Sequence, residues 1–188
     1  MTHPETLIQS VSREIGVGVF AAKALPKGTI VWARDAMDAA LTPQQLAAYP
    51  AAGRAKLERY LWRDADGSLI LCWDNARYMN HCCEPASLVT PFGFSICVRD
   101  VAAGAELTED YATYHLTDAE TFDCLCAVPA CRRKIGPLDA GTLAARWERA
   151  LAEALALVER VEQPLRPFLA PGATASALAR YKVPAGAR

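Results

Sequence analysis

Short apolar and β-branched runs, separated by glycine and proline turn signals, fill the N-terminal part of the chain. Residues 7–34 predict a strand, a turn and a strand, with Pro26-Lys27-Gly28 as the turn signal before the last apolar run. Residues 60–73 predict a hairpin around an Asp-Gly turn. Residues 93–98 alternate in character and predict another strand, and a short strand is expected at 106–108. The pattern therefore predicts a mainly β region.

A helix signal interrupts this β pattern. Thr42 suits an N-cap, Pro43 suits the first helical position and Gln45 completes a capping box, so a short helix should follow. Pro50 and Gly53 are expected to interrupt it, with a second helical piece over residues 54–59.

Near the C-terminus the period changes to that of a helix. Between residues 139 and 161, apolar side chains recur at intervals of three and four, and charged side chains fill the other face. This predicts one long amphipathic helix whose apolar stripe packs on the preceding domain or on a second copy of the chain. Pro164, Pro167 and Pro171 end the helix, and the Ala-, Gly- and Pro-rich tail is expected to be extended or mobile.

Composition narrows the class of protein. With 188 residues and 52% hydrophobic content, the chain suits one domain with an appendage. A net charge of −1 and a pI near 6.3 argue against a partner recognised through phosphates. Residues 1–5 lack the start of a signal peptide, and no apolar window approaches a membrane span, so a cytoplasmic protein is expected. The seven cysteines cannot all pair within the chain, which favours free thiols or zinc over disulfides.

Two polar runs are the strongest candidates for chemistry. The first is Arg77-Tyr78-Met79-Asn80-His81-Cys82-Cys83-Glu84-Pro85, and the second is Glu106-Leu107-Thr108-Glu109-Asp110-Tyr111. On spacing alone, either could be a polar turn. The combination is less ordinary, because a histidine, an amide, a thiol and a tyrosine hydroxyl offer hydrogen-bonding and metal-binding groups in two short stretches.

These two runs resemble the paired C-terminal motifs of the SET-domain protein lysine methyltransferases, R-F-x-N-H-x-C-x-P-N followed by E-L-T-x-D-Y. Gly16-Val17-Gly18-Val19-Phe20 upstream and Cys124-Leu125-Cys126 with Cys131 downstream also match that family in order. The resemblance covers about residues 10–136. It implies a mainly β fold, the β-clip-like SET fold of small curved sheets with a crossed C-terminal segment, followed by a C-terminal α-helix. The expected divisions are a SET domain at 1–118, a post-SET zinc-binding segment at 119–137, the amphipathic helix at 138–162 and the tail at 163–188.

The resemblance also implies which residues hold the co-substrate, S-adenosylmethionine. The implied set is Ile15, Gly16, Val17, Gly18, Tyr60, Asn80, His81 and Tyr111. A glycine pair at this spacing is weak evidence by itself, since a hairpin turn explains it as well. The match of Tyr60 to the family position is loose. In the alternative interpretation, Tyr60 and Trp62 are strand aromatics at a sheet surface, and this interpretation is preferred for Trp62.

Tyr111 is the main catalytic candidate implied by the family, with Tyr78 helping to wall the pocket. In the alternative interpretation, Tyr111 is a buried tyrosine whose hydroxyl caps a strand end.

Four cysteines form the expected metal site. Cys124, Cys126 and Cys131 are closely spaced, and the family supplies its fourth thiolate from the N-H-x-C motif, here Cys83. Four thiolates suit a closed, structural zinc site. Cys82 is interpreted as a non-ligand, and Cys72 and Cys97 as small buried hydrophobes. The alternative for the four is free buried thiols.

The chain departs from the family pattern at two positions. Ala86 stands where the family has Asn after Pro, which removes a polar contact at the crossing of the two motifs. Glu109 stands two residues before Tyr111, at a position that is often aromatic and linked to the number of methyl groups added. Its carboxylate could face solvent or reach the substrate ammonium, and the sequence leaves the choice open.

The favoured function is S-adenosylmethionine-dependent methylation of a lysine amine in a protein partner, without a nucleic acid or membrane. The alternative is a zinc-stabilised SET-like binding module with little turnover, which could dimerise through residues 139–161. Methylation of a small molecule or a free amino acid is a third interpretation that also fits the chemistry of the pocket.

Overall fold

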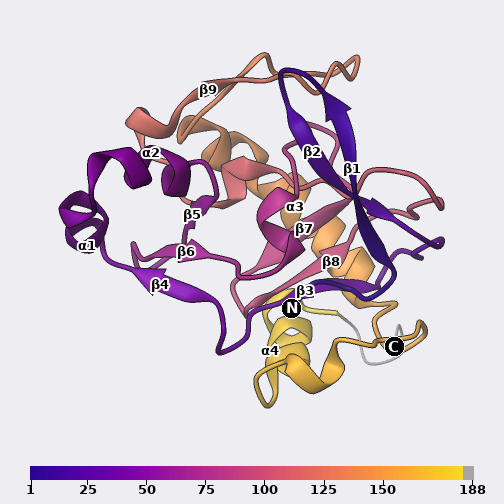
Figure 1. The fold of residues 1–188 in the computed structure, drawn as a ribbon. Helices are drawn as coiled ribbons and strands as arrows, with labels where there is room; N and C mark the ends of the chain where they lie inside the picture. The colour runs from indigo at the N-terminus through magenta and orange to yellow at the C-terminus, as the bar shows by residue number, and fades with distance from the viewer. Residues whose placement is uncertain (184–188) are drawn as a thin grey trace.

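Small antiparallel sheets dominate the computed structural model, which describes residues 1–183 (Figure 1). The strands are β1 (Thr6–Ser12), β2 (Gly16–Ala21), β3 (Ile30–Ala33), β4 (Ala39–Leu41), β5 (Leu61–Arg63), β6 (Leu69–Leu71), β7 (Ser87–Thr90), β8 (Phe94–Cys97), β9 (Phe122–Asp123) and β10 (Lys134–Ile135). β1 pairs with β2 and β9 with β10, while β3-β8-β7 and β4-β6-β5 form three-stranded sheets. The mainly β fold class predicted from the sequence is confirmed.

The predicted hairpin at 60–73 forms between β5 and β6. Trp62 pairs with Ile70, and Gly67 takes a positive φ of 84° in the turn. The sequence pattern missed β4, which adds to the other edge of β6. It also missed β7, the partner of the predicted strand β8.

Two short helices, α1 (Pro43–Ala48) and α2 (Ala51–Glu58), lie between β4 and β5. The predicted capping box is present: the Gln45 amide donates to Thr42 Oγ1 at 3.1 Å, and the Thr42 amide donates to Gln45 Oε1 at 2.7 Å. Pro50 separates the helices as expected. Gly53 lies inside α2, so the second helix begins three residues before the predicted start at residue 54.

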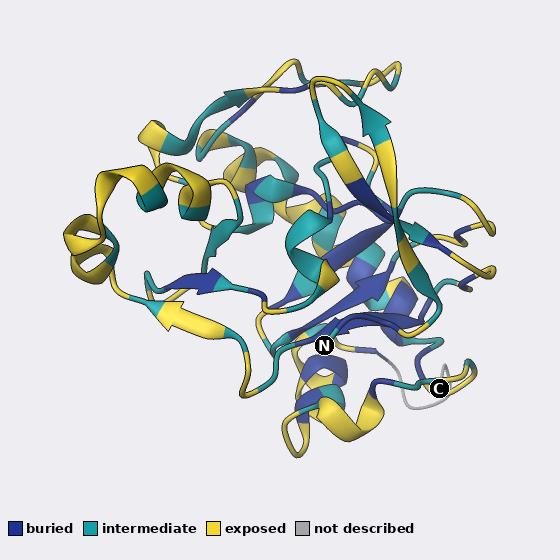
Figure 2. Ribbon diagram, viewed as in Figure 1, coloured by how far each residue is buried: buried dark blue, intermediate teal, exposed yellow. Residues whose placement is uncertain are grey.

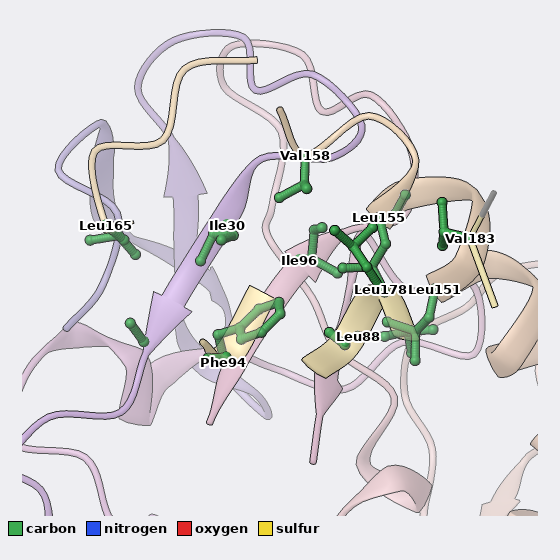
Figure 3. Close-up of a cluster of buried hydrophobic side chains, with 14 residues drawn as sticks. Ile30, Leu88, Phe94, Ile96, Leu151, Leu155, Val158, Leu165, Leu178 and Val183 are labelled. Carbon is green, nitrogen blue, oxygen red and sulfur yellow. The ribbon is translucent and has the colours of Figure 1, made fainter. Parts of the chain in front are cut away.

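The C-terminal helix α3 (Leu138–Leu155) is shorter than the predicted 139–161. Beyond it, the chain tightens into i→i+3 bonds, from the Leu157 amide to the Ala154 carbonyl and from the Val158 amide to the Leu155 carbonyl. This turn packs on Gly28, where an added Cβ would lie 2.8 Å from Leu157 Cβ. The apolar stripe of α3 packs on β7 and β8 of its own chain, the first of the two alternatives (Figure 3).

The expectation of an extended or mobile tail is wrong for residues 163–183. They contain a 3-10 helix at Arg166–Phe168 and the helix α4 (Ala173–Arg180). The tail contributes a set of side chains to the main core: Leu165, Ala173, Ala177, Leu178 and Val183 (Figure 3). The three prolines give this segment the composition of a linker, although its apolar residues recur at helical spacing. The remaining tail residues, 184–188, lie outside the described part.

The expected crossing of the C-terminal segment is present. Glu109 forms isolated parallel β-bridges with both His81 and Ser87. The Glu109 amide donates to the Asn80 carbonyl at 3.0 Å, and the Cys82 amide donates to the Glu109 carbonyl at 2.9 Å. The predicted strand at 106–108 makes only isolated bridges, such as Phe20 with Glu106, so it is not a regular strand. The two polar runs are nevertheless brought together.

Burial is concentrated in β3, β8 and the crossing, while α1, α2 and β4 are largely exposed (Figure 2). Cys72 and Cys97 are buried, as predicted. Among the described residues, no helix has the length and apolar character needed to cross a bilayer.

Candidate functional site

A cavity of about 780 Å³ opens between the α1–α2 insert, the β4-β6-β5 sheet and the segment that follows the crossing. Its inner lining is rich in aromatic and apolar side chains, among them Trp32, Tyr60, Trp62, Met79, Tyr111, Tyr114 and Phe122. Of the predicted site residues, Tyr60 and Tyr111 line this cavity.

Tyr111 begins a 3-10 helix, Tyr111–Thr113, which Asp110 caps through the Ala112 amide. The Tyr111 hydroxyl donates to the Met79 carbonyl at 2.6 Å, and its amide donates to His81 Nδ1 at 3.1 Å. Burial raises the pKa of the hydroxyl, and the charge of Glu109 adds to this effect. The group is therefore a neutral, fixed dipole at the cavity wall.

Aromatic rings form a connected wall around Tyr111. Its ring centroid lies 5.3 Å from that of Tyr114 and 5.9 Å from that of Phe122. Tyr114 lies 5.4 Å from Trp62, whose ring packs edge-on at 5.8 Å against Trp32. The sequence analysis missed Tyr114 and Phe122. Tyr114 could have been found, because it lies three residues after Tyr111 and directly follows the same 3-10 helix.

The glycine segment at the start of β2 is held by Asn80. Its side-chain Nδ2 donates to the Val17 carbonyl at 3.0 Å and to Glu106 Oε1 at 2.8 Å. A Cβ on Gly18 would lie 2.3 Å from Glu106 Oε1 and 2.8 Å from Asn80 Nδ2. Gly18 is therefore required by this close approach. Gly16, at a φ of 93°, is required by its backbone conformation.

Arg59 connects this segment to the cavity rim. Its guanidinium donates to the Ile15 carbonyl at 3.0 Å and lies 5.9 Å from the centre of the Tyr60 ring. Tyr60 packs edge-on against Tyr78 at 5.5 Å. The structure thus groups the predicted residues Ile15–Gly18, Tyr60, Tyr78 and Asn80, but Tyr78 lies outside the cavity lining.

His81 joins the aromatic wall to the cysteines. Its Nδ1 accepts from Tyr111, so the neutral ring carries its proton on Nε2, which lies 3.5 Å from Cys83 Sγ. Burial lowers the pKa of this imidazole to about 4, partly offset by Asp110.

The four predicted cysteines come together: the sulfurs of Cys83, Cys124, Cys126 and Cys131 all lie within 4.8 Å of one another. The Cys83 and Cys124 sulfurs are 3.8 Å apart. Tetrahedral zinc with bonds of about 2.3 Å would hold thiolates about 3.8 Å apart. Backbone amides donate to three of the sulfurs at 3.4 Å, as suits thiolates. The donor set fits zinc, and Cys82 lies outside it.

A partly buried ion pair, missed by the sequence analysis, fastens this segment to the crossing. Both terminal nitrogens of Arg132 donate to the Asp110 carboxylate at 2.7 Å, and Trp147 Nε1 donates to it at 3.2 Å. Arg132 Nε also lies 3.2 Å from Asp139. One carboxylate thereby joins the second polar run, the cysteine segment and α3.

The two departures from the family pattern are both buried. Ala86 is fully buried, and its amide donates to the Thr108 carbonyl at 3.0 Å, so backbone bonding holds the crossing there. Glu109 is 3% exposed, and its carboxylate accepts from the Tyr114 hydroxyl. Of the two alternatives left open for Glu109, a solvent-facing carboxylate is excluded.

A family model described as "SET domain" matches residues 16–112, just over half of the chain. Curated relatives named "Histone-lysine N-methyltransferase, H3 lysine-4 specific" match as well. The relative from Eremothecium gossypii is 42% identical over 65 residues, which is 30% of this chain and 7% of that protein. The relative from Mycosarcoma maydis is 30% identical over 129 residues, 62% of this chain and 9% of that protein. The chain thus spans less than a tenth of the length of these relatives.

A solved structure from Plasmodium falciparum aligns with 58% of this chain and 94% of its own, at a TM-score of 0.44 and 16% identity. This likeness is too weak to add to the argument. The family model covers both polar runs, the glycine segment and Tyr111. The chain belongs to the SET-domain family.

Proposed function

We propose that this protein transfers methyl groups from S-adenosylmethionine to the side-chain amine of a lysine in a protein substrate. The observation that carries the proposal is Tyr111, whose neutral hydroxyl is fixed on Met79 at the wall of an aromatic cavity. Membership of the SET-domain family supports it, since that family uses S-adenosylmethionine as its methyl donor.

The cavity supplies what the reaction needs from the protein. A lysine must lose its proton before its nitrogen can attack, and an aromatic, water-poor environment disfavours the ammonium form. Holding amine and methyl donor in line removes their translational freedom in advance, which can supply much of the rate. Tyr111, Tyr114 and Trp62 would enclose the lysine side chain.

The methyl donor would lie on the side of the crossing that carries Ile15–Gly18, Asn80 and His81. Asn80 holds the glycine segment close to the crossing, and the missing Cβ of Gly18 permits this close approach. Tyr60 and Tyr78 would wall this side.

The four cysteines would hold a structural zinc ion. When bound, zinc supplies four strong bonds that tie residue 83 to the segment 124–131. His81 and Arg132, which both contact Cys83, would then keep Tyr111 and the cavity wall in place.

The curated relatives are named for lysine 4 of histone H3. From that name we carry over only that the substrate is a lysine in a protein. The groove beside α1 and α2 would bind the flanking peptide.

Incubating the protein with isotopically labelled S-adenosylmethionine and a cell extract, followed by peptide mass spectrometry, tests the proposal. We expect label on lysine, reduced at least about tenfold in Tyr111→Phe. Tyr181→Phe is the matched control, because it removes a hydroxyl at the end of α4, away from the cavity, and should leave labelling unchanged. Bound S-adenosylmethionine without labelling in any extract would contradict the proposal and favour the binding module.

A further inference from the structure

Glu109 is a buried acid beside the aromatic rings of the cavity. Its side chain is 3% exposed, yet it lines the cavity together with Tyr111 and Tyr114. Its carboxylate accepts from the Tyr114 hydroxyl and, at 3.4 Å, from the Ser87 hydroxyl.

No cation compensates this carboxylate within residues 1–183. The arginines of the cavity lining have other partners. Arg63 pairs with Glu120, and Arg54 lies 4.0 Å from Glu58 and donates to the Ala47 carbonyl. Arg59 donates to the Ile15 carbonyl, and Arg77 donates to the carbonyls of Trp73 and Asp74. An anion in such a place costs free energy unless a positive charge joins it. The cavity therefore favours an occupant that brings a positive charge to the Glu109 carboxylate.

We propose that Glu109 receives the substrate ammonium and accepts its proton, and so acts as the general base that produces the neutral amine. The inference rests on the proposed function, and it gives a named catalytic task to a residue that departs from the family pattern. It also restricts the substrate to a group that enters as a cation.

The ammonium R–NH₃⁺ passes one proton to the Glu109 carboxylate, which leaves R–NH₂ and a carboxylic acid. The nitrogen lone pair forms the N–C bond to the methyl carbon, the C–S bond breaks, and its electron pair stays on sulfur. The product leaves as R–NH₂–CH₃⁺, and Glu109 releases its proton to solvent.

The environment of Glu109 suits this exchange. Burial raises the pKa of its carboxyl to about 7, while the Ser95 and Ser87 hydroxyls partly lower it. Two titratable groups near it remain neutral at this pH: burial raises the pKa of Cys97 to about 12 and that of Tyr111 further above its usual range. A base of this strength can both take and release a proton near neutral pH.

The test is the initial rate of label transfer to total cell-extract protein between pH 6 and 10, for wild type and Glu109→Gln. Wild type should rise with pH through about 7 and then level off. A glutamine side chain has nearly the same shape as glutamate but cannot accept the proton. The rate of Glu109→Gln should therefore be about a hundredfold lower than that of wild type at pH 7.5. It should climb steadily toward pH 10, as the ammonium itself titrates.

A Glu109→Gln rate within about threefold of wild type, with the same pH profile, would overturn this inference and leave the proposed function standing. No labelling by wild type would overturn both.

If circular dichroism shows that Glu109→Gln is unfolded, Tyr114→Phe decides. Losing the hydroxyl that stabilises the carboxylate should raise the carboxyl pKa and move the rising limb of the profile to higher pH. An unmoved limb would overturn the inference.

Discussion

At the scale of single residues, Gly18 shows how closely the two polar runs are fitted to the glycine segment. Replacing it with alanine would place a Cβ within 2.9 Å of three atoms, on Glu106, Asn80 and Val11. The Asn80 side chain would have to leave at least one of its two acceptors. We expect Gly18→Ala to lower the free energy of unfolding by about 1–3 kcal/mol and to weaken S-adenosylmethionine binding. Chemical denaturation and calorimetric titration measure the two effects.

Gly141 offers the matched control. It lies inside α3, and a Cβ there would meet nothing within 4 Å. Gly141→Ala should therefore raise stability by about 0.5–1 kcal/mol through helix propensity alone. If the two variants changed stability alike, the steric argument for Gly18 would fail.

Site residues could be predicted from the sequence where a family motif contains them, but not where only the fold brings them together. The four cysteines and Tyr111 stand at family positions, and the structure brings the sulfurs together. The burial of Glu109 could not be read from the sequence, because its polar neighbours suggested a solvated turn. The Asp110–Arg132 pair joins residues 22 apart that carry no shared pattern.

At the scale of elements, we expect the folding of the cysteine segment to depend on a bound metal ion. With zinc bound to four thiolates, we expect one zinc per chain by elemental analysis. Cys126→Ser should lose that metal and lower the melting temperature by several degrees, because metal binding and local folding are one equilibrium.

Cys82→Ser is the control for this experiment. Cys82 neighbours Cys83 but lies outside the sulfur cluster. It should keep full metal content, and equal metal loss in both variants would contradict the assignment of ligands.

The junction between the C-terminal segment and β3 depends on a second element-scale contact, the amide of Gln163. Its Oε1 accepts from the Ile30 amide at 2.9 Å, and its Nε2 donates to the carbonyls of Gly28 and Val158 at 2.7 and 2.9 Å. Gln163→Met would leave these backbone groups without partners, so we expect a loss of about 2–4 kcal/mol in the free energy of unfolding. Denaturant titration measures the loss.

Gln44→Met is the comparison, since Gln44 is exposed on α1. It should change stability by no more than about 0.5 kcal/mol. A Gln163 variant as mild as this control would show that the three bonds contribute little.

Helices and strands could be predicted where local sequence signals encode them. The prediction failed where long-range packing determines whether an element forms. The capping box at Thr42 and the hairpin at residues 60–73 are encoded within a few residues, and both form. β4 has a weak pattern and exists because β6 offers it an edge. α4 is a short helix that gains its stability from the core it covers, which sequence composition cannot show.

At the scale of the whole molecule, the tail and the β-sheet share one core. Leu178 of α4 packs in the same cluster as Phe94 of β8 and Leu151 of α3 (Figure 3). The tail should therefore unfold together with the sheet and not before it.

Leu178→Ala tests this cooperativity. Removing a buried leucine should cost about 2–4 kcal/mol. If the core is one unit, circular dichroism and tryptophan fluorescence should report a single transition, shifted equally in both signals. Leu138→Ala is the matched control, because Leu138 is 86% exposed at the start of α3 and should change stability by less than about 0.5 kcal/mol. A separate early transition in the Leu178 variant, with the main transition unchanged, would contradict this and show that the tail unfolds independently. The sheet that positions the crossing would then be stable without the tail.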